Sequence, residues 1–549
     1  MDQGARGGHP EKTSDGKTSA RPSSRSAQFG FLEIVCLAAA AALLTYLFIQ
    51  HAQASSRLID GVRFYWLDDD QMISMRYARN LVEGHGLCWN PGERVEGYTN
   101  LLWTLVMAVV HTTGISDAKA SLVMRGVALL LMIGVLVLAR QLLRRLGIRS
   151  VTVLAVALLC IVTCMDVVYW ATSGFETSLL TFLQLLFLVR VLGPGKDDLV
   201  AFGALALIPV VRADALHIWA GNVVLVLLLS KHRRTTYLLL GATLLPWLAQ
   251  LGFRLAYYEE WFPNTYYLKV VGLANKHRLG LLYDRNFLVR YAVPICLAVG
   301  TGIAKLETDK KIAALFTSLI PTLAYCVLTG GDNFGPFRFF AHVLPVLFVF
   351  AAAGARRVPR SVAGRRVWLA VLIVSCVPFV DPVKAIAPPN HNGDPYQQIT
   401  VAALLTKNAS PESTVAVVPA GIVPYFTRLH ALDIMGVNDK HLARLPYRRH
   451  SFIGHGKTDP EYTLAQKPDL VVSCRSESTA RRAPQHLIKH KERDFDYVLS
   501  FLASDTFREK YLPNPIANPY LHQWTAVFTT RLSPEFENRK SWQPVVVEP

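Results

Sequence analysis

The chain has 549 residues, of which 52% are apolar and only 18% are charged, against about 25% charged residues in an average soluble domain. Its 57 Lys and Arg exceed its 40 Asp and Glu, so the formal net charge is +17. This composition excludes a disordered chain, a coiled coil and a small disulfide scaffold, and it indicates a polytopic α-helical membrane protein. The basic excess would also suit a nucleic-acid-binding protein, and the position of the charges decides that question.

The N-terminal segment predicts a tail followed by a first membrane span. Residues 1–28 are rich in Gly, Ser, Lys and Arg and predict a disordered cytoplasmic tail. The apolar run 29–49 is long enough to cross a bilayer, and we interpret it as an uncleaved span. With it, the later apolar runs predict about 11 transmembrane helices. These later runs lie near 118–139, 151–168, 176–192, 199–211, 214–230, 235–256, 288–304, 312–329, 339–355 and 367–380.

The polar breaks between these runs show where the basic residues lie. Lys and Arg gather at 140–149, 231–234, 305–311 and 356–366. Short loops rich in Lys and Arg stay cytoplasmic, and all four do so if the apolar stretch 99–113 lies at the interface without crossing. Much of the net charge is therefore a topology signal, and no nucleic-acid-binding motif accompanies it. We predict no nucleic-acid partner.

The remaining chain divides into two expected domains. We expect a transmembrane domain over 29–380, with an outer loop at 51–117, and a soluble α/β domain over 381–549. Within the latter, 413–421 predicts a buried strand with a glycine turn, and 467–473 predicts a second strand. An odd number of spans from an inside N-terminus places this domain outside the cytoplasm.

The first outer loop carries three adjacent acids. Asp68, Asp69 and Asp70 directly follow three aromatic residues that suit a membrane interface. Adjacent carboxylates repel one another, so at least one pKa is raised and a cationic partner or a metal ion is needed. The next residues have helical periodicity, which puts Arg76 and Arg79 near the acids. The alternative is a solvated acidic loop that caps a helix N-terminus.

The loop 254–269 brings cations and aromatic residues to the interface. Arg254, Tyr257, Tyr258 and Lys269 form a group that suits an anionic lipid phosphate. An ordinary aromatic belt with cations that reach toward the headgroups remains the alternative.

The loop 330–345 carries ionisable groups into a span. Asp332 and Arg338 flank a Gly/Pro loop, and Arg338 and His342 enter the next apolar run. Such groups at membrane depth are costly and mark functional sites. A structural pair between Asp332 and Arg338 remains the alternative.

Two further charged positions lie between predicted spans. Ser173 and Glu176 have the spacing of a capping box at the head of a helix. Arg212 and Asp214 either form an ion pair at a helix break or face the same outer side as the other loops.

The outer loops therefore gather carboxylates, cations and aromatic side chains on one face. This arrangement fits chemistry on a polyprenyl-linked substrate: a cation would stabilise the leaving phosphate, and a carboxylate would activate an acceptor hydroxyl. The pair Asp69 and Asp70 would also suit a divalent cation such as Mg²⁺, Mn²⁺ or Ca²⁺. Alternatives are a transporter or flippase of lipid-linked sugars, or a non-catalytic envelope-assembly protein; no internal repeat favours the transporter.

The loop motifs resemble those of the GT-C polyprenyl-phosphate-sugar glycosyltransferases, and within them the terminal β-(1→2)-arabinofuranosyltransferases. The resemblance implies a helical membrane domain of about 11 spans with outer juxtamembrane helices, followed by a soluble outer domain. The residues that carry it are Asp69-Asp70, Arg79-Asn80, the run from Asn90 to Glu96, the loop 254–269 and the sequence GGDNFGPFRF at 330–339.

The resemblance also implies an activity and roles for residues. The expected enzyme transfers a monosaccharide, arabinofuranose or similar, from a polyprenyl-phosphate donor to a glycan or glycoconjugate on the outer face of the cell membrane. Asp69 would activate the acceptor or act as nucleophile, Asp70 would orient the acceptor or hold a metal ion, and Asp68 is the adjacent candidate. The implied donor-phosphate contacts are Lys269, Arg254 and Arg338. The expected substrate contacts are Arg76, Arg79, Asn80, Glu93, Arg94, Glu96, Tyr257, Tyr258, Asn264, Asp332 and His342.

Overall fold

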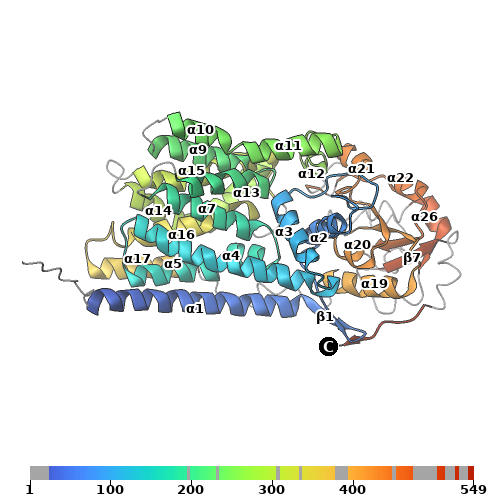
Figure 1. Ribbon diagram of the computed structural model, residues 1–549, viewed down its shortest axis with the longest axis horizontal. Coiled ribbons are helices and arrows are strands. Elements are labelled where there is room, and N and C mark those ends of the chain that lie inside the picture. Colours follow the sequence, from blue (N-terminus) through green and yellow to red (C-terminus); the bar gives the residue numbers. More distant parts are fainter. Residues whose placement is uncertain are drawn as a thin grey trace, which may run out of the picture.

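The computed structural model is elongated, and its two ends differ in character (Figure 1). A helical bundle fills one end, and a mixed α/β part fills the other. Three helices lie at the junction: α2 (Asp69–Val82), α3 (Leu101–Thr112) and α12 (Asn264–Lys269). The structure describes residues 24–193, 198–229, 234–303, 310–332, 337–376, 394–418, 420–447, 453–454, 456–473, 504–513, 526–530 and 542–548.

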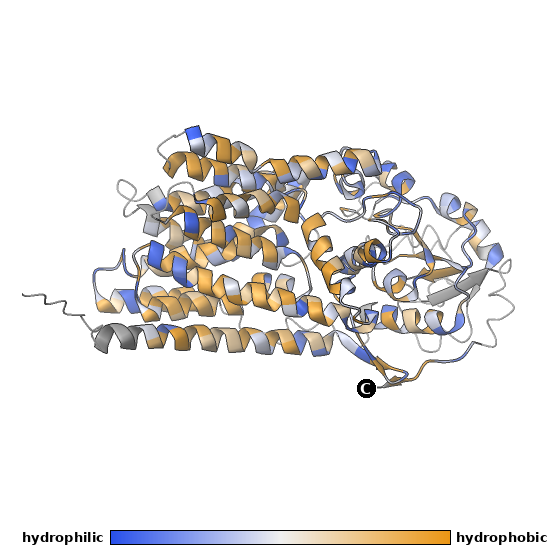
Figure 2. Cartoon of the chain, in the orientation of Figure 1, coloured by the Kyte–Doolittle hydropathy of each residue, from blue (hydrophilic) through white to orange (hydrophobic). Residues whose placement is uncertain are grey.

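The bundle consists of apolar helices that follow the hydrophobic runs of the sequence. It is predominantly hydrophobic in Figure 2, and large apolar side chains such as Leu130 and Leu238 are exposed on it, as expected of helices in contact with lipid. Its helices are α1 (Ser24–Ala54), α4 (Asp117–Arg145), α5 (Val151–Thr163), α6 (Met165–Thr172), α7 (Thr177–Val191), α8 (Leu199–Val211), α9 (Leu216–Leu229), α10 (Arg234–Ala242), α11 (Leu245–Tyr258), α13 (Lys276–Arg290), α14 (Ala292–Ile303), α15 (Ala313–Thr329), α16 (Leu344–Gly354) and α17 (Val362–Cys376).

Several of these helices are suited to cross a membrane. Among the described residues, Gly30–Ala54, Asp117–Arg145 and Arg234–Tyr258 are long and apolar enough to span it. The pair α5 and α6, bent by 56°, would count as a fourth span. Seven shorter apolar helices of 10–17 residues accompany them. Length and composition thus support several crossings, and the total of about 11 spans stays a prediction.

The stretch 99–113 forms a helix that differs in direction from the bundle. This helix, α3, has 12 residues, fewer than the ~20 that span a bilayer. It packs on α2 and stands at a steep angle to α1 and α4 (Figure 1). The arrangement agrees with the prediction that this stretch lies at the interface without crossing.

Buried polar contacts join three helices inside the bundle. The Gln184 amide donates to Asn222 at 3.1 Å and to Ser318 at 3.0 Å, and Asn222 donates back to Gln184 at 2.8 Å. A Cβ atom on Gly221 would lie 2.0 Å from the carbonyl oxygen of Thr317, so only glycine allows this approach of α9 to α15. Small residues and interhelical amide bonds are typical of helix packing in membranes.

The α/β part contains a five-stranded sheet in the order β4-β3-β5-β7-β6. β3 is parallel to both neighbours, whereas β7 is antiparallel to β5 and β6. The strands are β3 (Thr414–Val417), β4 (His430–Asp433), β5 (Leu470–Ser473), β6 (Tyr511–Pro513) and β7 (Ala526–Thr530). The described helices are α19 (Asp394–Asn408), α20 (Ile422–Thr427), α21 (Lys440–Arg444), α22 (Pro460–Ala465) and α26 (Asp505–Lys510).

Two expected strands are confirmed in this part. β3 falls within 413–421, and β5 falls within 467–473. Both bury their apolar side chains, as their Val-rich sequences predict. The expected linker after residue 380 lies outside the described residues, so the boundary at 381 stays a prediction.

A small antiparallel sheet connects the first span to the α/β part. β1 (Ser56–Ile59) pairs with β2 (Val62–Tyr65) on one side and with β8 (Val547–Glu548) on the other. The Lys407 ammonium of α19 contacts Asp60 in the turn of this hairpin at 3.0 Å. The α/β part is therefore attached next to the C-terminal end of α1.

Candidate functional site

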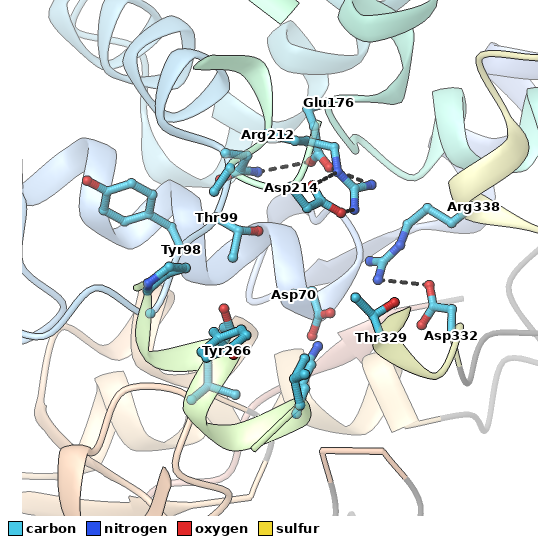
Figure 3. A pocket seen from close by; sticks show the side chains of 18 of the residues that line it. Asp70, Tyr98, Thr99, Glu176, Arg212, Asp214, Tyr266, Thr329, Asp332 and Arg338 are labelled. Atoms are coloured by element: carbon cyan, nitrogen blue, oxygen red, sulfur yellow. Dashed lines mark hydrogen bonds and ion pairs between the residues drawn. The ribbon is translucent and has the colours of Figure 1, made fainter. Parts of the chain in front are cut away.

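A cavity of about 320 Å³ lies where the bundle, the first outer loop, α12 and the α/β part meet. Aromatic and aliphatic side chains, among them Tyr98, Tyr266 and Val437, form part of its wall. Side chains of both charges project into it (Figure 3). Its charged lining residues are Asp70, Glu176, Arg212, Asp214, Lys269, Asp332 and Arg338. Apolar walls with a few convergent polar groups are typical of ligand sites.

The three adjacent acids point in different directions, because successive helical side chains are rotated by about 100°. Asp68 is the N-cap of α2, and its side chain accepts a hydrogen bond from the backbone N–H of Asp70. Asp69 accepts backbone N–H groups from Gly421 at 3.1 Å and Ile422 at 2.8 Å. Asp70 lines the cavity. The capping alternative thus describes Asp68, and Asp70 is the one of the three acids that lines the cavity.

Asp68 and Asp69 have raised pKa values. Burial raises the pKa of Asp68 to about 7, and the charge of Asp70 adds to the shift. Burial raises the pKa of Asp69 to about 8, although the Ile422 N–H opposes the shift. Burial is the larger cause in both cases, and repulsion within the cluster is smaller than expected from the sequence.

Two cations of the expected phosphate site reach the cavity. Lys269 lies in the last turn of α12. Arg338 forms an ion pair with Asp332 at 2.8 Å, and its guanidinium lies over the rings of Trp170 and Phe175. The predicted structural pair of Asp332 and Arg338 therefore exists, and it lies in the cavity wall (Figure 3).

A second charged group lines the same cavity. Arg212 contacts Glu176 at 3.3 Å and Asp214 at 2.7 Å, and Asn100 donates to Glu176 at 3.1 Å. The predicted capping box at Glu176 is wrong, because this side chain makes no cap hydrogen bond and binds Arg212 instead. The predicted pair of Arg212 and Asp214 is confirmed, and it faces the outer loops.

Three polar residues of α2 and the following loop line the cavity, although they are not among the site residues predicted from the sequence. The Ser74 hydroxyl donates to Asn100 at 2.9 Å, and Asn100 donates to Gln71 at 3.2 Å; all three line the cavity. Ser74 lies four residues after Asp70, on the same helix face. That spacing is the sequence signal for Ser74, whereas nothing local indicates Asn100.

The expected substrate contacts at Arg76, Arg79 and Asn80 are corrected by the structure. The Arg76 guanidinium donates to the carbonyls of Trp89, Pro424 and Leu429. Arg79 donates to the Tyr425 carbonyl and contacts Asp117 at 3.3 Å, and Asn80 donates to the Cys88 and Trp89 carbonyls. These buried side chains fasten α2 to its own loop and to the α/β part.

The run from Glu93 to Glu96 is also structural. Glu93 accepts a hydrogen bond from the Asn90 amide at 3.0 Å, and the Arg94 guanidinium lies 4.9 Å from the centre of the Tyr257 ring. Glu96 forms a buried, two-bond ion pair with Arg254. Arg254, expected to contact the phosphate, is thus paired with Glu96 and lies outside the cavity lining.

The remaining expected contacts have structural partners as well. The Tyr258 hydroxyl donates to the Leu87 carbonyl at 2.6 Å. The Asn264 amide donates to three carbonyls of the α/β part. His342 lies 3.5 Å from the Thr322 hydroxyl inside the bundle. With Tyr257 against Arg94, these four residues shape the surroundings of the cavity and do not line it.

The acids do not form an evident metal site. Among the described residues, no group of three or more His, Cys, Asp or Glu side chains is arranged to hold a metal ion. Each oxygen of Asp69 accepts one backbone N–H group, whereas Asp70 lines the cavity. The divalent cation stays a prediction.

The fold is of the GT-C type, as its likeness to two solved structures shows. ArnT from Cupriavidus metallidurans, bound to undecaprenyl phosphate, matches with a TM-score of 0.52 and 11% identity over 81% of this chain and 93% of that chain. The oligosaccharyltransferase of Archaeoglobus fulgidus, tethered to an acceptor peptide, matches with a TM-score of 0.51 and 11% identity over 90% of this chain and 74% of that chain. With its apolar helices, the protein is thus a multi-pass membrane protein.

In sequence, the chain is similar to two terminal β-(1→2)-arabinofuranosyltransferases. The protein of Mycobacterium tuberculosis is 31% identical over 278 residues, which cover 47% of this chain and 43% of the relative. The protein of Corynebacterium glutamicum is 29% identical over 278 residues, covering 45% and 40%. The resemblance inferred from the loop motifs is confirmed, although the match spans less than half the length of each relative. Residues 389–537 match a domain of unknown function, DUF8728.

Proposed function

We propose that this protein is a membrane glycosyltransferase that moves a monosaccharide, arabinofuranose or a similar sugar, from a polyprenyl-phosphate donor to a cell-envelope glycan or glycoconjugate. The observation that carries the proposal is one cavity that holds the Asp70 carboxylate together with Lys269 and Arg338. The names of the two sequence relatives and the lipid phosphate bound to ArnT support the same chemistry.

Asp70 is the proposed general base. Within the described chain, its side chain accepts no hydrogen bond, whereas both oxygens of Asp69 are occupied by backbone N–H groups. Asp70 takes the proton of an acceptor hydroxyl while the hydroxyl oxygen bonds to the anomeric carbon of the donor sugar. If the transfer retains configuration, Asp70 instead attacks this carbon and forms a covalent intermediate.

Lys269 and Arg338 are the proposed contacts of the leaving phosphate. The bond between the anomeric carbon and the phosphate oxygen breaks, and negative charge builds on that oxygen. Cations already placed beside the breaking bond stabilise this charge with little reorganisation. Arg338 is already oriented by Asp332 and by two aromatic rings. Glu176 and Asp214, both bound to Arg212, offer their carboxylates to the hydroxyls of the sugar.

The test is a transfer assay in membranes with polyprenyl-phosphate pentose and hexose donors. Asp70→Asn keeps the shape of the side chain and should lower transfer by about 10²- to 10⁴-fold, the usual contribution of a general base. Asp505→Asn, at an exposed acid of α26, is the matched control and should keep wild-type transfer.

Two results would contradict the proposal. Wild-type rates in the folded Asp70→Asn protein would remove Asp70 from the reaction. Absence of transfer with every donor, together with measurable movement of the lipid across the membrane, would instead support a transporter of lipid-linked sugars.

A further inference from the structure

We propose that the α/β part acts as a clamp on α12, and that Lys457 with Tyr447 positions Lys269 for the donor phosphate. This inference rests on the function proposed above. It gives a role to the segment that matches a domain of unknown function. Lys457 is a positioning residue, because it acts on the cavity only through the backbone that carries Lys269.

Lys457 is a buried cation held by carbonyl oxygens. Its ammonium donates to the carbonyls of Tyr267 at 2.6 Å, Val271 at 3.2 Å and Ala443 at 2.8 Å. These three bonds use all the donors of an ammonium group. The residue is 2% exposed, and burial lowers its pKa to about 8. Burial of a charge is costly unless its hydrogen bonds are satisfied, so the geometry of this contact is tightly defined.

The carbonyls that Lys457 binds lie on both sides of Lys269. Tyr267 precedes Lys269 by two residues, and Val271 follows it by two. α12 has only six residues, too few to be stable alone, and the last carbonyls of a helix lack partners within it. A cation at this end satisfies such carbonyls and also complements the helix dipole. Lys457 therefore fixes the turn from which the Lys269 side chain leaves the backbone.

Tyr447 holds the same turn from the α/β part. Its hydroxyl donates to the Leu268 carbonyl at 2.7 Å, lies 3.1 Å from the Lys269 carbonyl, and accepts the backbone N–H of Gly454 at 3.0 Å. Gly454 lies over the aliphatic stem of Lys269, since a Cβ atom there would be 3.3 Å from Cγ and 3.4 Å from Cε. The backbone and the stem of Lys269 are both held from this side.

The start of α12 is attached to the α/β part as well. The Asn264 amide donates to the carbonyls of Gly436, Val437 and Asp439, each at 3.0 Å. Val437 and Ile453 of the α/β part also line the cavity. Both ends of α12 thus depend on the same part of the chain, while the Asp70 side of the cavity belongs to α2.

Asp70 lies on α2 and Lys269 lies on α12, which explains why the reaction would need the α/β part. The base and the leaving-group cation lie on separate elements, so their separation depends on the clamp. Among the described residues, the Lys269 ammonium has no hydrogen-bond or ion-pair partner of its own, and its direction is set by its backbone and by Gly454. Loss of the clamp should displace this cation and leave Asp70 in place.

The test compares three variants of the full-length protein: Lys457→Met, Tyr447→Phe and Lys407→Met. Lys457→Met removes the ammonium, and Tyr447→Phe removes one hydroxyl at nearly unchanged volume. Lys407→Met is the matched control, because Lys407 also joins the α/β part to the membrane half, but at the β1–β2 hairpin. Thermal unfolding in detergent establishes that each variant is folded.

For Lys457→Met we expect kcat/KM for the donor to fall by about 10- to 100-fold, the effect of misplacing a reacting group by about 1 Å. The KM for the donor should rise, and binding of undecaprenyl phosphate should weaken. Tyr447→Phe should show the same pattern to a smaller extent, and Lys407→Met should match the wild type. Acylation of Lys269 by an amine reagent, followed by mass spectrometry, should change in the first two variants only.

Donor KM and Lys269 acylation at wild-type values in folded Lys457→Met and Tyr447→Phe proteins would overturn the clamp. A role in stability alone would lower the amount of folded enzyme without changing either quantity. Failure of the proposed function is a different result: the wild type would transfer no sugar, while Lys269 acylation would still report whether Lys457 positions the side chain.

Discussion

Asp68, Asp69 and Asp70 are adjacent in the sequence, yet their carboxylates have three different environments. Asp68 caps α2, Asp69 binds the backbone of the α/β part, and Asp70 faces the cavity. The sequence indicates the acidic cluster and its raised pKa values, but not which acid is available. That choice depends on Gly421, whose N–H lies 352 positions further along the chain.

The raised pKa of Asp69 predicts a pH dependence of stability. Burial raises this pKa to about 8 in the folded protein, against about 3.9 in an unfolded chain. Between these values the folded state binds more protons, so the free energy of unfolding falls as the pH rises toward 8. Asp69→Asn removes the titrating group. We expect the melting temperature of the variant, relative to the wild type, to increase between pH 6 and pH 9 in detergent.

The exposed acid Asp505 provides the control for this titration. Asp505→Asn also removes one acid, but it leaves the acids at 68–70 unchanged, and its melting temperature is measured over the same pH range. A constant difference between Asp69→Asn and the wild type would contradict a titration of Asp69 between pH 6 and pH 9 in the folded protein.

At the scale of elements, the sequence predicts local structure well and long-range contacts poorly. Hydrophobic runs indicate the bundle helices, and Val-rich segments indicate β3 and β5. These predictions succeed because the hydrophobic pattern of a segment determines whether that segment is buried. The partners of Arg76 and Arg79 are carbonyls of Pro424 and Tyr425. Every residue has a backbone carbonyl, so the sequence does not indicate which carbonyls these arginines bind. The sequence alone therefore favours a substrate-binding role for them.

The contact of α2 with the α/β part predicts a strong effect at Gly421. A Cβ atom at this position would lie 1.9 Å from the carbonyl oxygen of Asp69, which is fixed at the start of α2. Gly421→Ala must therefore separate the two elements. We expect a lower melting temperature and faster cleavage of the α/β part by a protease added to the purified protein.

A glycine with open surroundings is the matched control. Gly203 lies within α8, and a Cβ atom added there would meet no neighbouring atom within 4 Å. Gly203→Ala should be neutral or stabilising by up to about 1 kcal/mol, since alanine favours a helix. Equal stability and equal protease resistance of Gly421→Ala and Gly203→Ala would show that α2 does not depend on this approach.

At the scale of the whole molecule, the two ends of the bundle differ in charge and in contacts. α4 begins at Asp117, which contacts Arg428 of the α/β part at 2.9 Å. It ends near Arg144, which contacts Glu33 in the first turns of α1. The arginine-rich segment 356–366, which covers most of the connection from α16 to α17 and the first turn of α17, lies at the end away from the α/β part (Figure 1). Basic loops are retained in the cytoplasm, so we predict that the cavity faces outward.

This orientation predicts opposite labelling of two exposed positions. In a background without native cysteines, Glu509→Cys in α26 and Arg360→Cys in the basic loop both place a thiol at an exposed residue. A membrane-impermeant maleimide should label Glu509→Cys in intact cells, and should label Arg360→Cys only after the membrane is opened. The reverse pattern would place the cavity on the cytoplasmic side, where an outer-face glycan acceptor could not reach Asp70. Labelling therefore tests the location of the chemistry independently of any transfer assay.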